Sequence, residues 1–185
     1  MPRKKKLIIT ITAAVLMLLV SVGLTLAYIV TSSQPVINTF TVGNVAISLS
    51  ETTGDTYPLL PGITLEKDPT LTVHTGSEAC WVFFTIDEPA DLPHFISYEI
   101  AEGWTLLEEG HTNVYYRQVN ATYKDESFPL IKDDTVQVYD TVTEEDLAGL
   151  HEQKILNFTG YAIQRNGMTT VHDAWHQLSE EVTDR

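Results

Sequence analysis

Residues 25–49 read T-L-A-Y-I-V-T-S-S-Q-P-V-I-N-T-F-T-V-G-N-V-A-I-S-L, and this stretch decides how the rest of the chain is organised. Its start ends a long apolar segment, its middle is polar, and its end alternates apolar and polar residues as a β-strand does. We therefore expect three parts: a signal segment over residues 1–27, a flexible arm over residues 28–39 and one β domain over residues 40–185.

The segment before the arm has the pattern of an export signal. Four of the first six residues are basic, no charge follows until Glu51, and residues 7–30 are almost wholly apolar. Small side chains at Thr25 and Ala27 predict cleavage between Ala27 and Tyr28. The alternative is an uncleaved membrane anchor, because the apolar run is long enough to cross a bilayer. Either way the sequence predicts a domain that is secreted or held at the cell surface.

The charge balance bounds the possible partners. The chain carries 11 basic and 25 acidic residues, a formal net charge of −14. Cleavage would remove four basic residues and leave 7 basic against 25 acidic ones, a net charge of about −18. So acidic a surface repels phosphate backbones, and we expect no nucleic-acid partner. Cys80 is the only cysteine, so no intrachain disulfide can form and the core alone must hold the domain.

A change of parity marks the first part of the β domain. Apolar residues alternate through Phe40 and Val42, and the alternation resumes one position out of step from Val45 to Leu49. Gly43 stands at the change, and a bulge or tight bend there is expected to return both sets of side chains to the same core.

The most apolar run covers residues 80–86. Its alternation places Cys80, Val82 and Phe84 on one face and Trp81 and Phe83 on the other, which is typical of a central strand covered on both sides. Seven or eight short strands in all predict a mainly β chain: an antiparallel jelly-roll-like β-sandwich. Further β runs lie at residues 71–75, 95–100, 104–107, 114–119, 136–142 and 155–163.

Two helical segments interrupt the β pattern, at residues 143–150 and 170–180. In the second, Thr170 and Asp173 form a T-x-x-D capping box. This short C-terminal helix is expected to cover the sheet beside Trp81. Its apolar stripe consists of Val171, Ala174, Trp175 and Leu178.

Several short segments together resemble the TasA/camelysin (CalY) family of Gram-positive bacteria. The resemblance implies a secreted jelly-roll domain, export through a SipW-type signal peptidase, and assembly into biofilm matrix fibres, while some family members carry a metallopeptidase label. The segments are K-K-K with T-L-A-Y, N-T-F-T-V-G-N-V-A-I-S-L (38–49), Y-P-L-L-P-G-I-T-L-E-K-D-P (57–69), S-E-A-C-W-V-F-F (77–84), V-Y-Y-R (114–117) and Y-A-I-Q-R-N-G-M (161–168).

The best candidates for metal chemistry are His172 and His176. Two histidines four positions apart on a helix can share a zinc ion, and a zincin carries Glu after the first of them. Here that position is Asp173, which the capping box already uses. We therefore expect an exposed helix flank, no metal site and no cofactor. At Cys80 the strand pattern favours a buried small side chain over a nucleophile.

The sequence thus predicts a structural protein that associates with itself outside the cell. An extended segment of one subunit would complete the sheet of the next, and the arm is suited to donate it through Ile29, Val30, Val36 and Ile37. The expected partners are further copies of the chain, an accessory matrix subunit and, during export, the signal peptidase. Two alternatives stay open: a camelysin-like metallopeptidase and a monomeric glycan-binding module at the cell surface.

Overall fold

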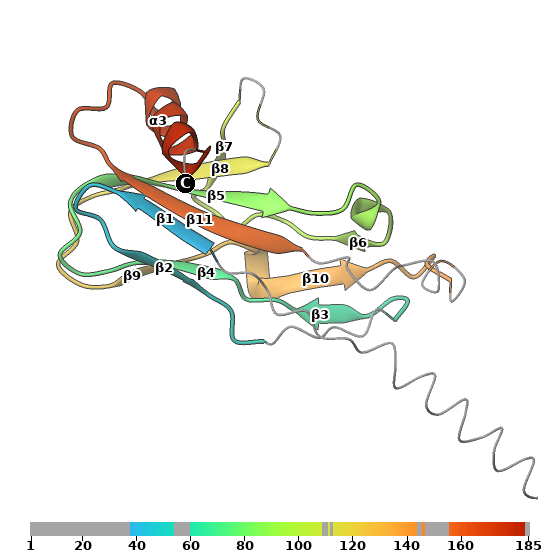
Figure 1. The fold of residues 1–185 in the computed structure, drawn as a ribbon. Helices are drawn as coiled ribbons and strands as arrows, with labels where there is room; N and C mark the ends of the chain where they lie inside the picture. Colours follow the sequence, from blue (N-terminus) through green and yellow to red (C-terminus); the bar gives the residue numbers. More distant parts are fainter. Residues whose placement is uncertain are drawn as a thin grey trace, which may run out of the picture. The chain divides into compact units, whose positions relative to one another are not determined.

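The central strand of the protein is β5 (Cys80–Asp87), the most apolar of the predicted strands. The computed structural model describes residues 38–53, 60–108, 111, 113–143, 146 and 156–183. β5 occupies the middle of a five-stranded sheet in the order β1-β11-β5-β8-β7 (Figure 1). The other members are β1 (Asn38–Val42), β11 (Asn157–Gln164), β8 (Val114–Val119) and β7 (Thr105–Leu106).

Two three-stranded sheets form the facing layer. One has the order β2-β4-β9 and the other the order β3-β10-β6, and all their strand pairs are antiparallel. Short 3₁₀ turns, η1 (Leu92–His94) and η2 (Lys132–Asp134), lie between strands. The strands are β2 (Ile47–Ser50), β4 (Thr70–Val73), β9 (Glu126–Pro129), β3 (Thr64–Glu66), β10 (Thr135–Val138) and β6 (Ile96–Ser97).

The main core fills the space between these layers, which makes the fold a β-sandwich. The five-stranded sheet contributes Val82, Phe84 and Ala162, all fully buried, and the facing sheets contribute Leu71 and Val138. Phe84 is the aromatic centre of this core, because the rings of Tyr115, Trp104 and Phe158 all lie against it. The prediction that alternate residues of the central strand would face one core is therefore confirmed.

Helix α3 (Val171–Thr183) covers the other face of the five-stranded sheet (Figure 1). The capping box at its start is formed as predicted. The Asp173 N–H donates to Thr170 Oγ1 at 3.1 Å, and the Thr170 N–H donates to Asp173 Oδ2 at 3.0 Å. Ala174 and Leu178 are buried against Phe83. The C-terminal helix and its docking face are thus confirmed.

The bend at Gly43 does not return the chain to the same core, contrary to what the parity change suggested. Gly43 has φ +84°, and the chain passes there from β1 in the five-stranded sheet to β2 in the facing layer. Val42 packs in the cluster under α3, whereas Val45 and Leu49 belong to the main core. The prediction of one shared core is wrong, because the bend carries the chain to the other layer of the sandwich.

The predicted strand inventory is incomplete. The described residues contain eleven strands, and neither β3 nor β9 was expected. β3 has only three residues, and β9 contains Glu126 and Pro129, residue types that are depleted in strands. A mainly β chain with a C-terminal helix is nevertheless confirmed, while the predicted signal segment over residues 1–27 lies outside the described residues. In the described ranges no helix is long and apolar enough to cross a membrane.

Candidate functional site

The sheet edge formed by β1 is the candidate site for self-association. β1 pairs with β11 in parallel, from Asn38 opposite Thr159 to Val42 opposite Ile163. Among the described residues it has a strand on one side only within its sheet, so in this part of the chain the backbone groups on its other side form an open edge. β1 also includes Asn38 and Thr39, which places the last two residues of the predicted arm inside the strand. The parallel pairing departs from the predicted antiparallel pattern.

An aromatic row holds β1 in place. The rings of Phe40 and Tyr161 stack with centroids 5.4 Å apart and planes at 17°. Trp175 of α3 contacts Tyr161 edge to face, with ring centroids 5.3 Å apart. By contrast, Thr39 and Thr41 are exposed. The edge strand is therefore anchored through one aromatic side chain and presents small hydroxyl side chains to the solvent.

The end of β1 is fastened by Gln164, the last residue of β11. The Asn44 N–H donates to Gln164 Oε1 at 3.3 Å, and the amide nitrogen of Gln164 donates to Glu78. A Cβ on Gly43 would lie 2.7 Å from Gln164, so both the positive φ and the close approach require glycine here. This turn sets where the open edge ends.

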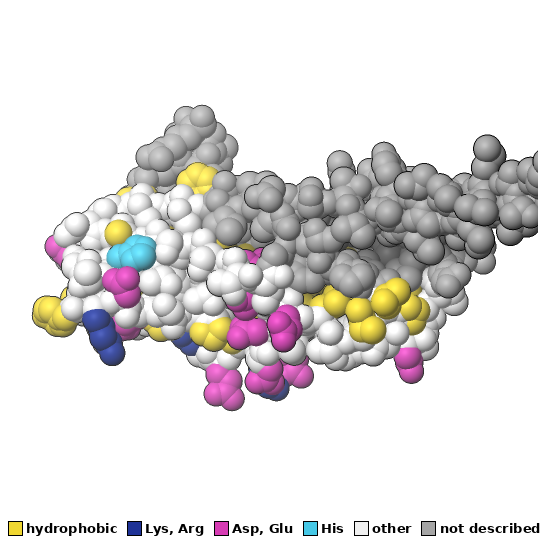
Figure 2. All heavy atoms as spheres, turned by 90° about the horizontal axis from the view of Figure 1, so that it is seen from below, with side chains coloured by type: hydrophobic (Ala, Val, Ile, Leu, Met, Phe, Trp, Pro, Cys, Tyr) yellow, Lys and Arg dark blue, Asp and Glu magenta, His cyan; other side chains and the backbone are white. Residues whose placement is uncertain are grey.

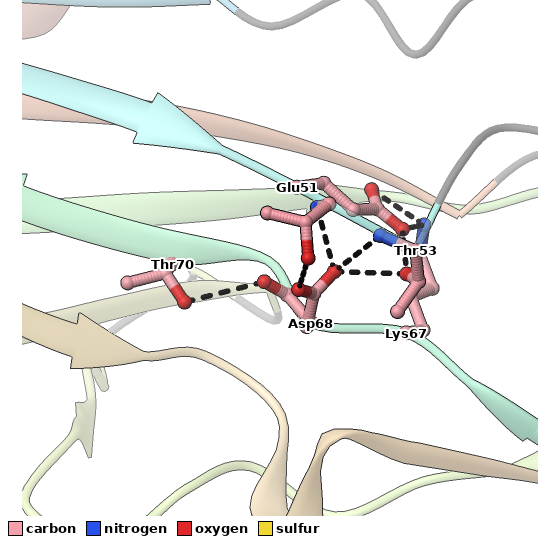
Figure 3. A network of polar contacts seen from close by, with 6 residues as sticks. Glu51, Thr53, Lys67, Asp68 and Thr70 are labelled. Carbon is pink, nitrogen blue, oxygen red and sulfur yellow. Dashed lines mark hydrogen bonds and ion pairs between the residues drawn. The ribbon is translucent and has the colours of Figure 1, made fainter.

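A buried ion pair and a carboxylate cap fix the chain just after β2 (Figure 3). Lys67 Nζ lies 2.8 Å from Glu51 Oε1, and both side chains are only 6% exposed. Burial acts to raise the pKa of Asp68, but hydrogen bonds from Thr52 and Thr53 outweigh it and lower that pKa to about 2. Both backbone N–H groups and both hydroxyls donate to this carboxylate. The network clamps the end of β2 to the connection between β3 and β4.

Four large aromatic side chains pack against the two cores. Trp104 and Tyr115 lie against the main core, and Trp81 and Tyr116 lie in the cluster under α3. The Arg117 side chain lies against both Trp104 and Phe128, with its guanidinium carbon 5.0 Å and 4.5 Å from the two ring centroids, and the two rings also meet each other edge to face. These contacts show that the four aromatic side chains serve to pack the two cores.

The two histidines of α3 lie on its exposed side. His176 Nδ1 is 3.6 Å from Glu180 Oε2, one turn further along, and both side chains are about 70% exposed. Within the described ranges, His, Cys, Asp and Glu form no group of three that could hold a metal ion. Cys80 is fully buried, and burial raises the pKa of its thiol to about 11, as expected for a packing residue.

The structure brings together three polar side chains that sequence reasoning missed. His74, just after β4, lies between Ser48 of β2 and Asp125, which precedes β9. Its Nε2 is 3.0 Å from Ser48 Oγ and its Nδ1 is 3.2 Å from Asp125 Oδ2. No local pattern announces this cluster, because its members are 26 and 51 positions apart.

Other predicted site residues lie outside the described residues. These are the cleavage pair Ala27 and Tyr28 and the arm residues Ile29, Val30, Val36 and Ile37. The acidic turn predicted over residues 143–150 is described only at its start. There Thr143 and Asp146 form a second capping box, with the Asp146 N–H donating to Thr143 Oγ1 at 3.2 Å.

Comparison of the chain with protein-family models, with curated proteins and with solved structures finds no match.

Proposed function

We propose that this is a secreted structural protein that assembles with itself into extracellular matrix fibres. One observation carries the proposal: among the described residues β1 is an open sheet edge, and it takes up the last two residues of the predicted arm, Asn38 and Thr39. A strand added at such an edge gains main-chain hydrogen bonds, and alternate side chains can enter pockets of the neighbour. The arm over residues 28–39 would be the donor, with Ile29, Val30, Val36 and Ile37 as the apolar anchors.

The energetics of strand addition predict a concentration-dependent process. Ordering a residue costs roughly 1–2 kcal/mol of backbone entropy. Against this stand the ladder hydrogen bonds and the burial of apolar surface at about 25 cal/mol per Å². For an arm of a dozen residues (28–39) the two sides are of similar size, so single arm substitutions should decide whether fibres form.

Export would confine assembly to the outside of the cell. While residues 1–27 stay attached, the arm is tethered to the membrane, and cleavage before Tyr28 frees it at the outer face. N-terminal sequencing of the secreted protein tests this step, with Tyr28 as the expected first residue. If the protein is instead found in the membrane fraction and begins at Met1, the segment is an uncleaved membrane anchor.

The arm is tested by three forms of the chain. Protein beginning at Tyr28 should form filaments visible by electron microscopy, whereas protein beginning at Thr39 should fold and stay monomeric. Ile37→Asp or Ile29→Asp in the longer form should also prevent filaments. Light scattering as a function of concentration compares the forms, and filaments from the Thr39 form would rule out the arm as donor.

The acceptor edge is tested by a charge placed on β1. Thr41 is exposed on the open strand, and Thr41→Lys should block strand addition, because a lysine on an edge opposes pairing. Gln118→Lys adds the same charge at an exposed position of β8, opposite Trp81 of β5 and away from the β1 edge, and should leave assembly unchanged. Equal assembly of the two variants would exclude β1 as the acceptor.

A further inference from the structure

The outer face of the β2-β4-β9 sheet carries the Ser48–His74–Asp125 cluster, apart from the β1 edge. Figure 2 views the molecule from the side of the facing layer, where much of the described surface is polar or backbone and acidic side chains gather in one region. In this cluster the His74 imidazole bridges the Asp125 carboxylate on one side and the Ser48 hydroxyl on the other. Ser48 is half-buried and the His74 side chain is 39% exposed, so both residues are partly accessible to solvent.

From this geometry we propose that Ser48 is an activated nucleophile that accepts an acyl group from small activated esters. A serine hydroxyl is a weak nucleophile by itself and needs an adjacent base to take its proton. His74 Nε2 lies within hydrogen-bond reach of Oγ, and the third group orients the base, which is the arrangement such activation requires.

Asp125 is the positioning residue of the cluster. The backbone N–H of Thr75 donates to its Oδ1 at 2.8 Å, which leaves Oδ2 to face His74 Nδ1. The Thr75 N–H and then His74 lower the pKa of this carboxyl, so it is ionised at neutral pH. A carboxylate at Nδ1 holds the proton there and leaves Nε2 as an acceptor for the Ser48 hydroxyl.

The transfer step needs no further reactant. Ser48 Oγ forms a bond to the carbonyl carbon of the ester while its proton passes to His74 Nε2. The bond from that carbon to the leaving-group oxygen then breaks, and the alcohol or phenol leaves with the proton from the imidazole. The product is an O-acyl serine, and no group is oxidised or reduced.

The same face supplies an internal control. Ser48, Thr72 and Ser127 lie opposite one another in a single row across the three strands. The Thr72 and Ser127 hydroxyls are 2.8 Å apart and bond to each other, and in the described structure no imidazole lies within hydrogen-bond distance of either. Ser127 is thus a neighbouring serine hydroxyl without a base, and it should react at the rate of an ordinary hydroxyl.

The test is acetylation of the purified chain by p-nitrophenyl acetate, located by peptide mass spectrometry. General-base assistance contributes about 10²–10⁴-fold in rate, and we expect Ser48 to be acetylated about 100-fold faster than Ser127. Equal acetylation of the two serines would overturn the proposal. Because both serines are in one molecule, this comparison does not depend on the folding of any variant.

Variants then assign the roles. His74→Ala should reduce the Ser48 rate to that of Ser127, and added imidazole should restore it in part, which a merely structural role of His74 would not allow. Asp125→Asn should slow Ser48, and Asp125→Glu should restore some of the loss. If His74→Ala leaves the Ser48 rate unchanged while its melting temperature stays that of the parent, His74 is not the base. The measurement is independent of fibre assembly and stands if that function fails.

Discussion

The indole of Trp175 lies against Phe83, with ring centroids 5.2 Å apart, and this contact joins the C-terminal helix to the central strand. The same indole contacts Tyr161, which stacks on Phe40 of β1. Docking of α3 is thereby coupled to the seating of the edge strand. Truncation of the Trp175 side chain should therefore weaken the packing of both α3 and β1.

Trp175→Ala is accordingly expected to destabilise the domain by about 3 kcal/mol, the low end of the range for large aromatic truncations, because Trp175 is only partly buried. Urea unfolding followed by circular dichroism measures it. His176→Ala, at the exposed neighbouring position, is the control and should change stability by less than about 0.5 kcal/mol. Equal stability of the two variants would mean that the helix does not depend on this contact.

Two glycines with the same backbone conformation allow strain to be separated from steric conflict. Gly76 and Gly103 both have φ +85°. A Cβ on Gly76 meets nothing within 4 Å, whereas one on Gly103 would lie 1.8 Å from Arg117 Nη2. Gly76→Ala should cost about 1–2 kcal/mol for the left-handed backbone alone.

Gly103→Ala should cost about 2 kcal/mol more than Gly76→Ala, because Arg117 would have to leave its place against the rings of Trp104 and Phe128. It would also lose its hydrogen bonds to the carbonyl oxygens of Gly103 and Glu102. Thermal unfolding of the two variants gives the difference. Identical losses would show that Arg117 moves aside without cost.

The buried pair of Lys67 and Glu51 predicts a strong dependence of each partner on the other. Lys67→Met should destabilise the domain by about 3–5 kcal/mol, because it leaves the Glu51 carboxylate buried without its ammonium partner. The double variant with Glu51→Leu removes both charges and should recover most of that loss. A double-mutant cycle on unfolding free energies measures the coupling, and additive effects would contradict the prediction.

The carboxylate of Asp68 predicts a stability loss in acid. Its folded pKa of about 2 lies below the ordinary value of 3.8, so its contribution is full above the ordinary value and is lost as pH falls toward 2. Replacing the hydroxyl donors by Thr52→Val with Thr53→Val should raise the Asp68 pKa and reduce the loss. Nuclear magnetic resonance titration of this carboxyl checks it, and titration near 3.8 in the parent would contradict the prediction.

The elements predicted correctly are those that are determined by residues close together in the sequence. The central strand follows from alternation within residues 80–86, and α3 follows from its capping box and apolar stripe. β9 was missed because Glu126 and Pro129 disfavour a strand; at a sheet edge Pro129 is tolerated, since an edge proline need not donate to the ladder.

Pairing between distant segments leaves no local signal. The parity change at Gly43 announced a bend, but it could not tell whether the chain would stay in one layer or pass to the other. The same holds for the candidate sites. The open edge depends on β1 meeting β11, and the Ser48–His74 contact depends on the register between β2 and β4. Serine and histidine are common residues, so only their placement in the sheet distinguishes Ser48 and His74 from the other serines and histidines of the chain.

The parallel pairing of β1 with β11 joins two strands that are far apart in the sequence. The two strands are the first and last in the described chain, and Asn44 bonds to Gln164, 120 positions away. Contacts this distant in sequence form slowly, because the intervening chain must first be brought together. Synthesis proceeds from the N-terminus, so β1 exists long before its partner strand does. We therefore expect this seam of the sheet to close late, because among the described strands β1 pairs only with β11.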